Sequence, residues 1–290
     1  MRVTTTSVHH ILTGIALVCT LLSSEGCAAS DTNSAPLAVV TAPPKKVLTM
    51  PTVSIPTEGT LGAEQWQITT DGTWAHWHSV GHAPIDIYRH NGRTYELQTV
   101  QLDYVKGVKA PYLVQVTAPT DAPFLGKPHE SPRGSSADPP VGALIITPGH
   151  DDRFDLTFRT KRGVKTLADF NGPRIVDFFE DDCIGCTGEK AELGDLFRAL
   201  QKHSGILVVV TSQRFSRVQN QIRSIDPAVP VTLDNHYSVY SAFDIRHLPL
   251  ALVQSSSGQF VDAYVGMLQE SDASDLLREV GINVATGKKT

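Results

Sequence analysis

The 290-residue chain contains little cysteine, no excess of positive charge and no second long apolar run. Two of its four cysteines, Cys19 and Cys27, lie in or at the end of an N-terminal apolar segment, which excludes them as ready metal ligands in a folded core. A net charge of -5 provides no electrostatic footprint for nucleic acid, so we expect no such partner. The other two cysteines, Cys183 and Cys186, must therefore work as a pair.

Residues 1–27 are typical of an export signal. Arg2 supplies the positive start, residues 11–22 are apolar, and small residues follow. The apolar stretch is too short to span a bilayer. Residues 24–27 (Ser-Glu-Gly-Cys) loosely resemble a bacterial lipobox, so Cys27 is either a lipidation site or a spent signal residue. We expect an exported protein of the periplasm or cell envelope, which lipidation of Cys27 would attach to the membrane.

Composition divides the remaining chain into two folded units. Residues 28–60 are rich in Ala, Pro, Ser and Thr with almost no aromatic residues, which predicts a flexible linker. A second Pro/Gly/Ser-rich linker covers residues 119–142. Between and after these linkers we expect a small β-rich domain over 61–118 and a larger domain over 143–285.

The sequence of the small unit, residues 61–118, predicts β-strands. Asn91-Gly92 is typical of a hairpin turn between two of them. The expected strands cover 64–69, 85–88, 94–102 and 112–116. Alternate residues on a strand share a face, so His76 and His78, with His82 nearby, could hold copper or zinc. No cysteine or obvious third fixed ligand supports such a site, and we expect an ordinary histidine-bearing surface with no metal ion.

The larger unit alternates strand and helix patterns, which predicts an α/β fold with a mixed sheet. A hairpin is expected over 154–167. Leu193, Leu196, Phe197 and Leu200 recur at helical spacing, and Gly205 is placed to end that helix. The expected strands cover 174–179, 206–210, 230–233, 250–253 and 260–265, and further helices are expected at 214–225, 237–243 and 271–280.

Three segments of this unit resemble the thioredoxin family. Residues 176–183 (Val-Asp-Phe-Phe-Glu-Asp-Asp-Cys) match the strand before its nucleophile, residues 245–249 (Ile-Arg-His-Leu-Pro) its cis-proline segment, and residues 258–266 its last hairpin and glycine. Export and the long interval between Cys186 and Pro249 resemble the TlpA/ResA-like branch. The resemblance implies a thioredoxin fold, a central mixed sheet flanked by helices, preceded here by the small β-rich domain.

The expected chemistry follows from these positions. Cys183, at a helix N-terminus where backbone N–H groups favour its thiolate, should attack disulfides, and Cys186 should resolve the mixed disulfide, so the two form a redox disulfide. The resemblance implies a buried Asp177 with a raised pKa that exchanges a proton with Cys186. It also implies a cis Pro249 that leaves the backbone of Leu248 free to bind an extended peptide, with His247 beside them.

We therefore expect an exported thiol-disulfide oxidoreductase that acts on protein disulfides and dithiols and needs no bound cofactor. The acidic residues 180–182 oppose thiolate formation and favour a reductase, which would need a membrane thiol electron donor, whereas an imidazolium at His247 would stabilise a thiolate and favour an oxidase. Two alternatives remain. One is a peroxiredoxin-like thiol peroxidase that uses Cys186; the other is a copper- or zinc-binding envelope protein that uses Cys183, Cys186 and either His247 or His236.

Overall fold

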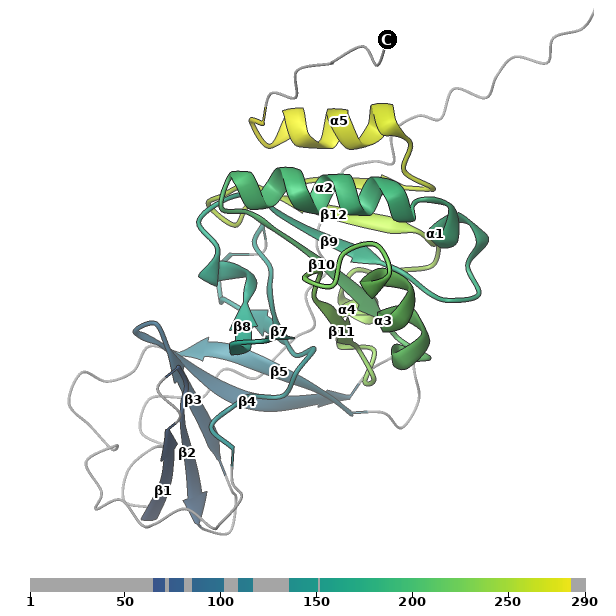
Figure 1. Cartoon of the computed structure of the whole chain (residues 1–290). Helices are drawn as coiled ribbons and strands as arrows, with labels where there is room; N and C mark the ends of the chain where they lie inside the picture. The colour runs from purple at the N-terminus through teal and green to yellow at the C-terminus, as the bar shows by residue number, and fades with distance from the viewer. Residues whose placement is uncertain are drawn as a thin grey trace, which may run out of the picture. The chain divides into compact units, whose positions relative to one another are not determined.

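The computed structural model describes residues 65–70, 73–80, 85–101, 109–116, 136–150 and 152–282 (Figure 1). The expected export signal, the linker over 28–60 and the lipidation candidate Cys27 lie outside these described residues, as does His82. None of the helices in the described ranges combines the length and the apolar character needed to cross a membrane.

The first sheet contains eight strands in chain order. Its strands are β1 (Gln65–Thr70), β2 (Ala75–Val80), β3 (Asp86–His90), β4 (Arg93–Gln101), β5 (Lys109–Val116), β6 (Leu144–Ile146), β7 (Asp155–Thr160) and β8 (Gly163–Thr166). All neighbouring strands are antiparallel except β5 and β6, which are parallel. Asn91 and Gly92 both have positive φ, as a tight turn between β3 and β4 requires.

The expected hairpin over 154–167 forms β7 and β8, and it extends this first sheet. Two hydrogen bonds from side chains to backbone oxygens join parts of the structure that are far apart in the sequence. The indole N–H of Trp74 donates to the backbone oxygen of Val164 at 2.9 Å, and the hydroxyl of Tyr112 donates to that of Ser238 at 3.1 Å. Tyr112 is fully buried in the same apolar cluster as the second sheet, so β5 shares a core with the larger domain.

The second sheet has five strands in the order β11-β10-β9-β12-β13. They are β9 (Arg174–Phe178), β10 (Ile206–Thr211), β11 (Val231–Leu233), β12 (Leu250–Gln254) and β13 (Phe260–Val265). Strands β9, β10 and β11 are parallel, whereas β12 is antiparallel to both β9 and β13. Every residue of β9 and β10 is buried, because helices cover central parallel strands on both faces.

The helices of the larger domain are α1 (Ile184–Gly188), α2 (Lys190–Lys202), α3 (Phe215–Arg223), α4 (Ser238–Ala242) and α5 (Glu270–Glu279), with a short 3₁₀ helix η2 (Leu167–Asp169) before them. Figure 1 shows α2 and α5 on one side of the second sheet and α3 and α4 on the other. The apolar stripe predicted on α2 is buried, and the helix ends before Gly205. The predicted α/β thioredoxin fold, a mixed sheet flanked by helices, is confirmed.

Candidate redox-active site

The dithiol lies where the central strand β9 gives way to α1. Cys183 is the N-cap of α1, and its sulfur is bonded to that of Cys186, with 5.2 Å between the two Cα atoms. The backbone N–H of Cys186 also points at the Cys183 sulfur, at 3.1 Å. Cys183 is half-buried and Cys186 is fully buried, so Cys183 is the sulfur that a partner molecule can reach.

The cis-proline segment packs directly against the dithiol loop. The Leu248–Pro249 peptide bond is cis, and Pro249 lies so close to Gly185 that a Cβ at Gly185 would be 2.9 Å from the proline Cδ. A glycine inside the dithiol motif therefore permits this approach. Leu248 is half-buried and His247 is exposed.

Two carboxylic acids are fully buried, Asp177 on β9 and Glu189 between α1 and α2. Neither oxygen of Asp177 has a hydrogen-bond partner among the described residues. Glu189 accepts one hydrogen bond, from the N–H of Leu268 at 2.9 Å, and its backbone N–H donates to the oxygen of Gly185. Burial, reinforced by Glu189, raises the pKa of Asp177 well above its usual value, and burial raises the pKa of Glu189 as well.

The sequence reasoning found Asp177 and missed Glu189. A glutamate at the start of a helix is expected to be exposed, with its negative charge stabilised by the helix dipole. The one available signal is spacing, because Glu189 follows Cys186 by three residues and so lies one helical turn away. The acid pair makes the interior next to the dithiol a place where adding further negative charge is costly.

The three acidic residues before Cys183 are held in different ways. Glu180 is buried, and its carboxylate accepts hydrogen bonds from the side chains of Thr211, Ser212 and Tyr240 and from the backbone of Ser212. Asp181 forms ion pairs with two arginines, at 3.2 Å and 3.4 Å. Asp182 alone is exposed. Much of the negative charge expected to act on Cys183 is thus hydrogen-bonded or compensated.

Exposed apolar side chains lie within the dithiol loop and beside α1. Ile184, between the two cysteines, is 91% exposed, and Met267 and Val265 are also exposed. The Met267 side chain lies against Gly188 and near Gly185, which places it beside α1. An exposed apolar rim of this kind suits the docking of an apolar segment of another chain.

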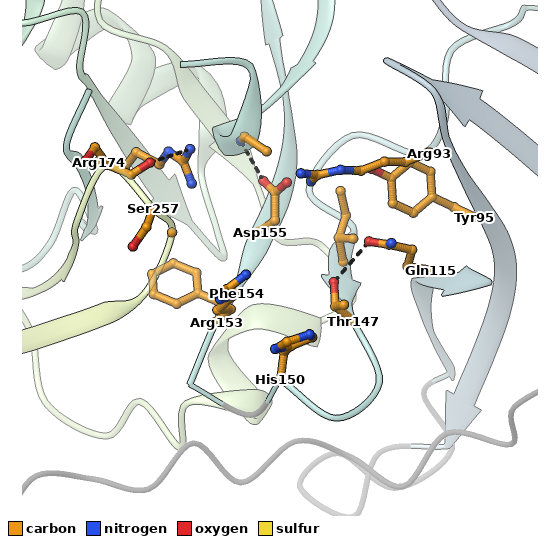
Figure 2. Close-up of a pocket in the computed structure, with 14 residues that line it drawn as sticks. Arg93, Tyr95, Gln115, Thr147, His150, Arg153, Phe154, Asp155, Arg174 and Ser257 are labelled. Carbon is orange, nitrogen blue, oxygen red and sulfur yellow. Dashed lines mark hydrogen bonds between the residues drawn. The ribbon is translucent and has the colours of Figure 1, made fainter. Parts of the chain in front are cut away.

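A polar cavity of about 330 Å³ lies at the other end of the same strands. It is lined by Arg174 at the start of β9, by the turn after β12 and by residues of the first sheet. Figure 2 shows the Asp155 carboxylate between Arg93 and Arg174. Burial raises the pKa of Asp155 to about 6 although backbone N–H groups of Leu156 and Leu167 donate to it. The strands separate this cavity from the dithiol, so it forms no part of the redox site.

Of the other residues singled out in the sequence, His236 is half-buried in the segment before α4, and His76 and His78 lie on β2 of the first sheet. Among the described residues, the one group of histidines, cysteines and acids whose ligand atoms converge is His76, His78 and Asp86. The structure therefore brings together Cys183, Cys186 and the cis-proline segment, and it places the histidine pair on a different sheet.

No protein-family model and no curated protein sequence matches this chain. Among solved structures it is similar to a thiol:disulfide interchange protein of the thioredoxin family from Chlorobium tepidum, with 18% identity over 43% of this chain and 92% of the other, and a TM-score of 0.39. StoA from Bacillus subtilis has 18% identity over 43% of this chain and 95% of the other, at a TM-score of 0.37.

A peroxidoxin, BcpB from Mycobacterium tuberculosis, is similar to the same extent, with 16% identity over 43% of this chain and 91% of the other, and a TM-score of 0.37. The thioredoxin fold of this chain is established by its own strand order, its helix-capping dithiol and its cis proline.

Proposed function

We propose that this protein is an exported thiol-disulfide oxidoreductase that reduces protein disulfides through Cys183 and Cys186. The observation that carries the proposal is the disulfide at the N-cap of α1, with one sulfur accessible, one buried, and the cis-proline segment packed against the loop between them. A dithiol in this position can exchange electrons with a disulfide presented alongside it.

In the proposed reaction the reduced Cys183 thiolate attacks one sulfur of a substrate disulfide and expels the other as a thiolate. A mixed disulfide between Cys183 and the substrate results. Cys186 then loses its proton and attacks the Cys183 sulfur, which releases the second substrate thiolate and forms the Cys183–Cys186 disulfide. Two electrons pass from the protein to the substrate, and the two substrate thiolates take up two protons, one released by Cys186 and one from solvent.

The buried acids suit the second of these steps. A carboxylate whose pKa is raised toward that of a thiol can take the proton from Cys186, and Asp177 and Glu189 both have raised pKa values. The same acids disfavour a thiolate close to them. If the reduced dithiol is not strongly stabilised, the Cys183–Cys186 pair has a low reduction potential. A low potential favours a reductase, which would receive its electrons from a membrane thiol donor.

The apolar rim supports protein substrates. Ile184 lies between the two cysteines and Met267 beside α1, and in the proposed complex backbone groups of Leu248 pair with an extended segment of the substrate. Export and membrane attachment through Cys27 are proposed from the sequence pattern of residues 1–27. An extracytoplasmic protein with this dithiol would meet oxidised substrates and would itself need re-reduction.

Insulin reduction in the presence of dithiothreitol tests the proposal, with turbidity as the readout. The protein should accelerate precipitation, Cys183→Ser should abolish the effect, and Cys186→Ser should trap a mixed disulfide visible by mass spectrometry. Cys27→Ser serves as the matched control and should retain full activity. No acceleration by the wild-type protein would overturn the proposal, and turnover of hydrogen peroxide in its place would identify a thiol peroxidase.

A further inference from the structure

Three potential ligands share one face of the first sheet. His76 and His78 alternate along β2, so their side chains point to the same side. In the antiparallel pair of β2 and β3, His78 is opposite Asp86 and His76 is opposite Tyr88. Because directly opposed residues in a sheet project from the same face, the register brings Asp86 to the two imidazoles.

The ligand atoms already converge. One oxygen of Asp86, Oδ1, is 2.7 Å from Nε2 of His76 and 2.8 Å from Nδ1 of His78. All three of these atoms lie within 4.8 Å of one another. The His76 ring stacks on Tyr88, with 4.4 Å between ring centroids and 3° between planes, which fixes the orientation of this imidazole. His78 and Asp86 are partly exposed, so an ion can reach the cluster from solvent.

We propose that His76, His78 and Asp86 form a binding site for a divalent cation of the zinc and copper class. Two imidazole nitrogens and one carboxylate oxygen are a donor set that zinc and copper(II) accept, whereas calcium and magnesium prefer oxygen ligands alone. A cation at this point replaces the two N–H hydrogens that face Asp86, and each imidazole then carries its hydrogen on its other ring nitrogen.

The proposed site differs in kind from the dithiol. It leaves at least one coordination position for water or an exogenous ligand, because the protein provides three donors and zinc takes four. It requires no thiol, and Cys183 and Cys186, joined in a disulfide, offer no thiolate to compete for the ion. The proposal therefore stands or fails independently of the oxidoreductase activity.

The test uses the full chain in its oxidised form, free of affinity tags and treated with chelator, in equilibrium dialysis against zinc chloride. One zinc ion per chain should be retained. His78→Gln and Asp86→Asn should each weaken zinc binding by about tenfold or more, since each removes a ligand. His150→Gln and His203→Gln are matched controls, because both histidines are exposed and lie outside the cluster, and both variants should bind zinc as the wild type does.

Electron paramagnetic resonance of the copper(II)-loaded wild-type protein provides a readout that does not depend on the stability of any variant. The spectrum should show coupling to two imidazole nitrogens. Failure to retain stoichiometric zinc, unchanged zinc affinity in folded His78→Gln and Asp86→Asn variants, or a copper spectrum without two coupled nitrogens would each overturn the proposal. In that case the cluster is a hydrogen-bonded His-Asp-His arrangement and nothing more.

Discussion

Replacing Glu189 by Gln should make the protein more stable at neutral pH, although the residue is fully buried. The Glu189 side chain accepts a hydrogen bond from the N–H of Leu268, and a Gln amide oxygen can accept the same bond. The substitution removes a carboxyl group whose pKa burial raises to about 8. It also removes the repulsion that Glu189 exerts on Asp177.

The sign follows from proton linkage. A carboxyl group with a higher pKa in the native state than in the unfolded chain binds its proton more tightly when the protein is folded. Its contribution to stability is therefore most favourable below the unfolded pKa and declines as the pH rises toward the folded pKa. The decline is about 1.4 kcal/mol per pH unit for each such group.

The magnitude follows from the two pKa values of Glu189. Between its usual value of 4.5 and pH 7 the native state loses about 3 kcal/mol of stability through this one group. Glu189→Gln should recover a gain of that order at pH 7 and very little at pH 4. Asp177→Asn should act in the same direction, because the Asp177 oxygens have no hydrogen-bond partner among the described residues.

The assay is urea unfolding of the oxidised protein at pH 5, 6, 7 and 8. The free energy of unfolding should fall with pH more steeply for the wild type than for Glu189→Gln. Glu270→Gln, at an exposed position in α5, is the matched control and should keep the wild-type slope. Equal slopes for wild type and Glu189→Gln, or a Glu189→Gln variant that is less stable at pH 8, would refute the reasoning.

Three further substitutions test separate features. Ile184→Ser should change the free energy of unfolding by no more than about 0.5 kcal/mol, because the side chain is 91% exposed. The same variant should reduce insulin more slowly than the wild type does, while its rate on a small aromatic disulfide is unchanged. Equal rates of insulin reduction by variant and wild type would contradict a docking role for Ile184. Tyr112→Phe removes the hydrogen bond to Ser238 and should cost about 1 kcal/mol in urea unfolding. Gly172→Ala places a Cβ inside contact distance of the backbone oxygen of His203 and should cost about 1–3 kcal/mol, read as a lower Tm; an unchanged Tm would show that the backbone yields freely.

The parts of the fold that were predictable are those with a local cause. β9 and β10 are continuous apolar runs because helices cover them on both sides, and α2 shows its buried stripe at a period of 3.6 residues. The Asn91-Gly92 turn has the positive φ values that this pair accommodates. Each of these signals lies within about fifteen residues, so a single sequence contains it.

The pairing of strands that are far apart in the chain leaves no comparable local pattern in the sequence. The β7–β8 hairpin was evident as a hairpin, but its membership of the first sheet depends on β6 pairing with β5 and β7. The third member of the histidine cluster was missed for the same reason. Asp86 reaches His76 and His78 only through the register of β2 on β3, which one residue of slippage would reverse.

The buried acids show most clearly how the site depends on long-range structure. Asp177 could be anticipated from the resemblance of residues 176–183 to the thioredoxin strand before the nucleophile, whereas Glu189 accepts its hydrogen bond from the backbone of Leu268, which lies far along the chain. Together they set two properties at once. The pair costs stability as the pH rises, and in the proposed mechanism it would disfavour a thiolate at Cys186 and accept the proton of that thiol. An apolar pair at these positions would give a more stable protein at neutral pH, but it would lack the proton acceptor that the proposed mechanism uses.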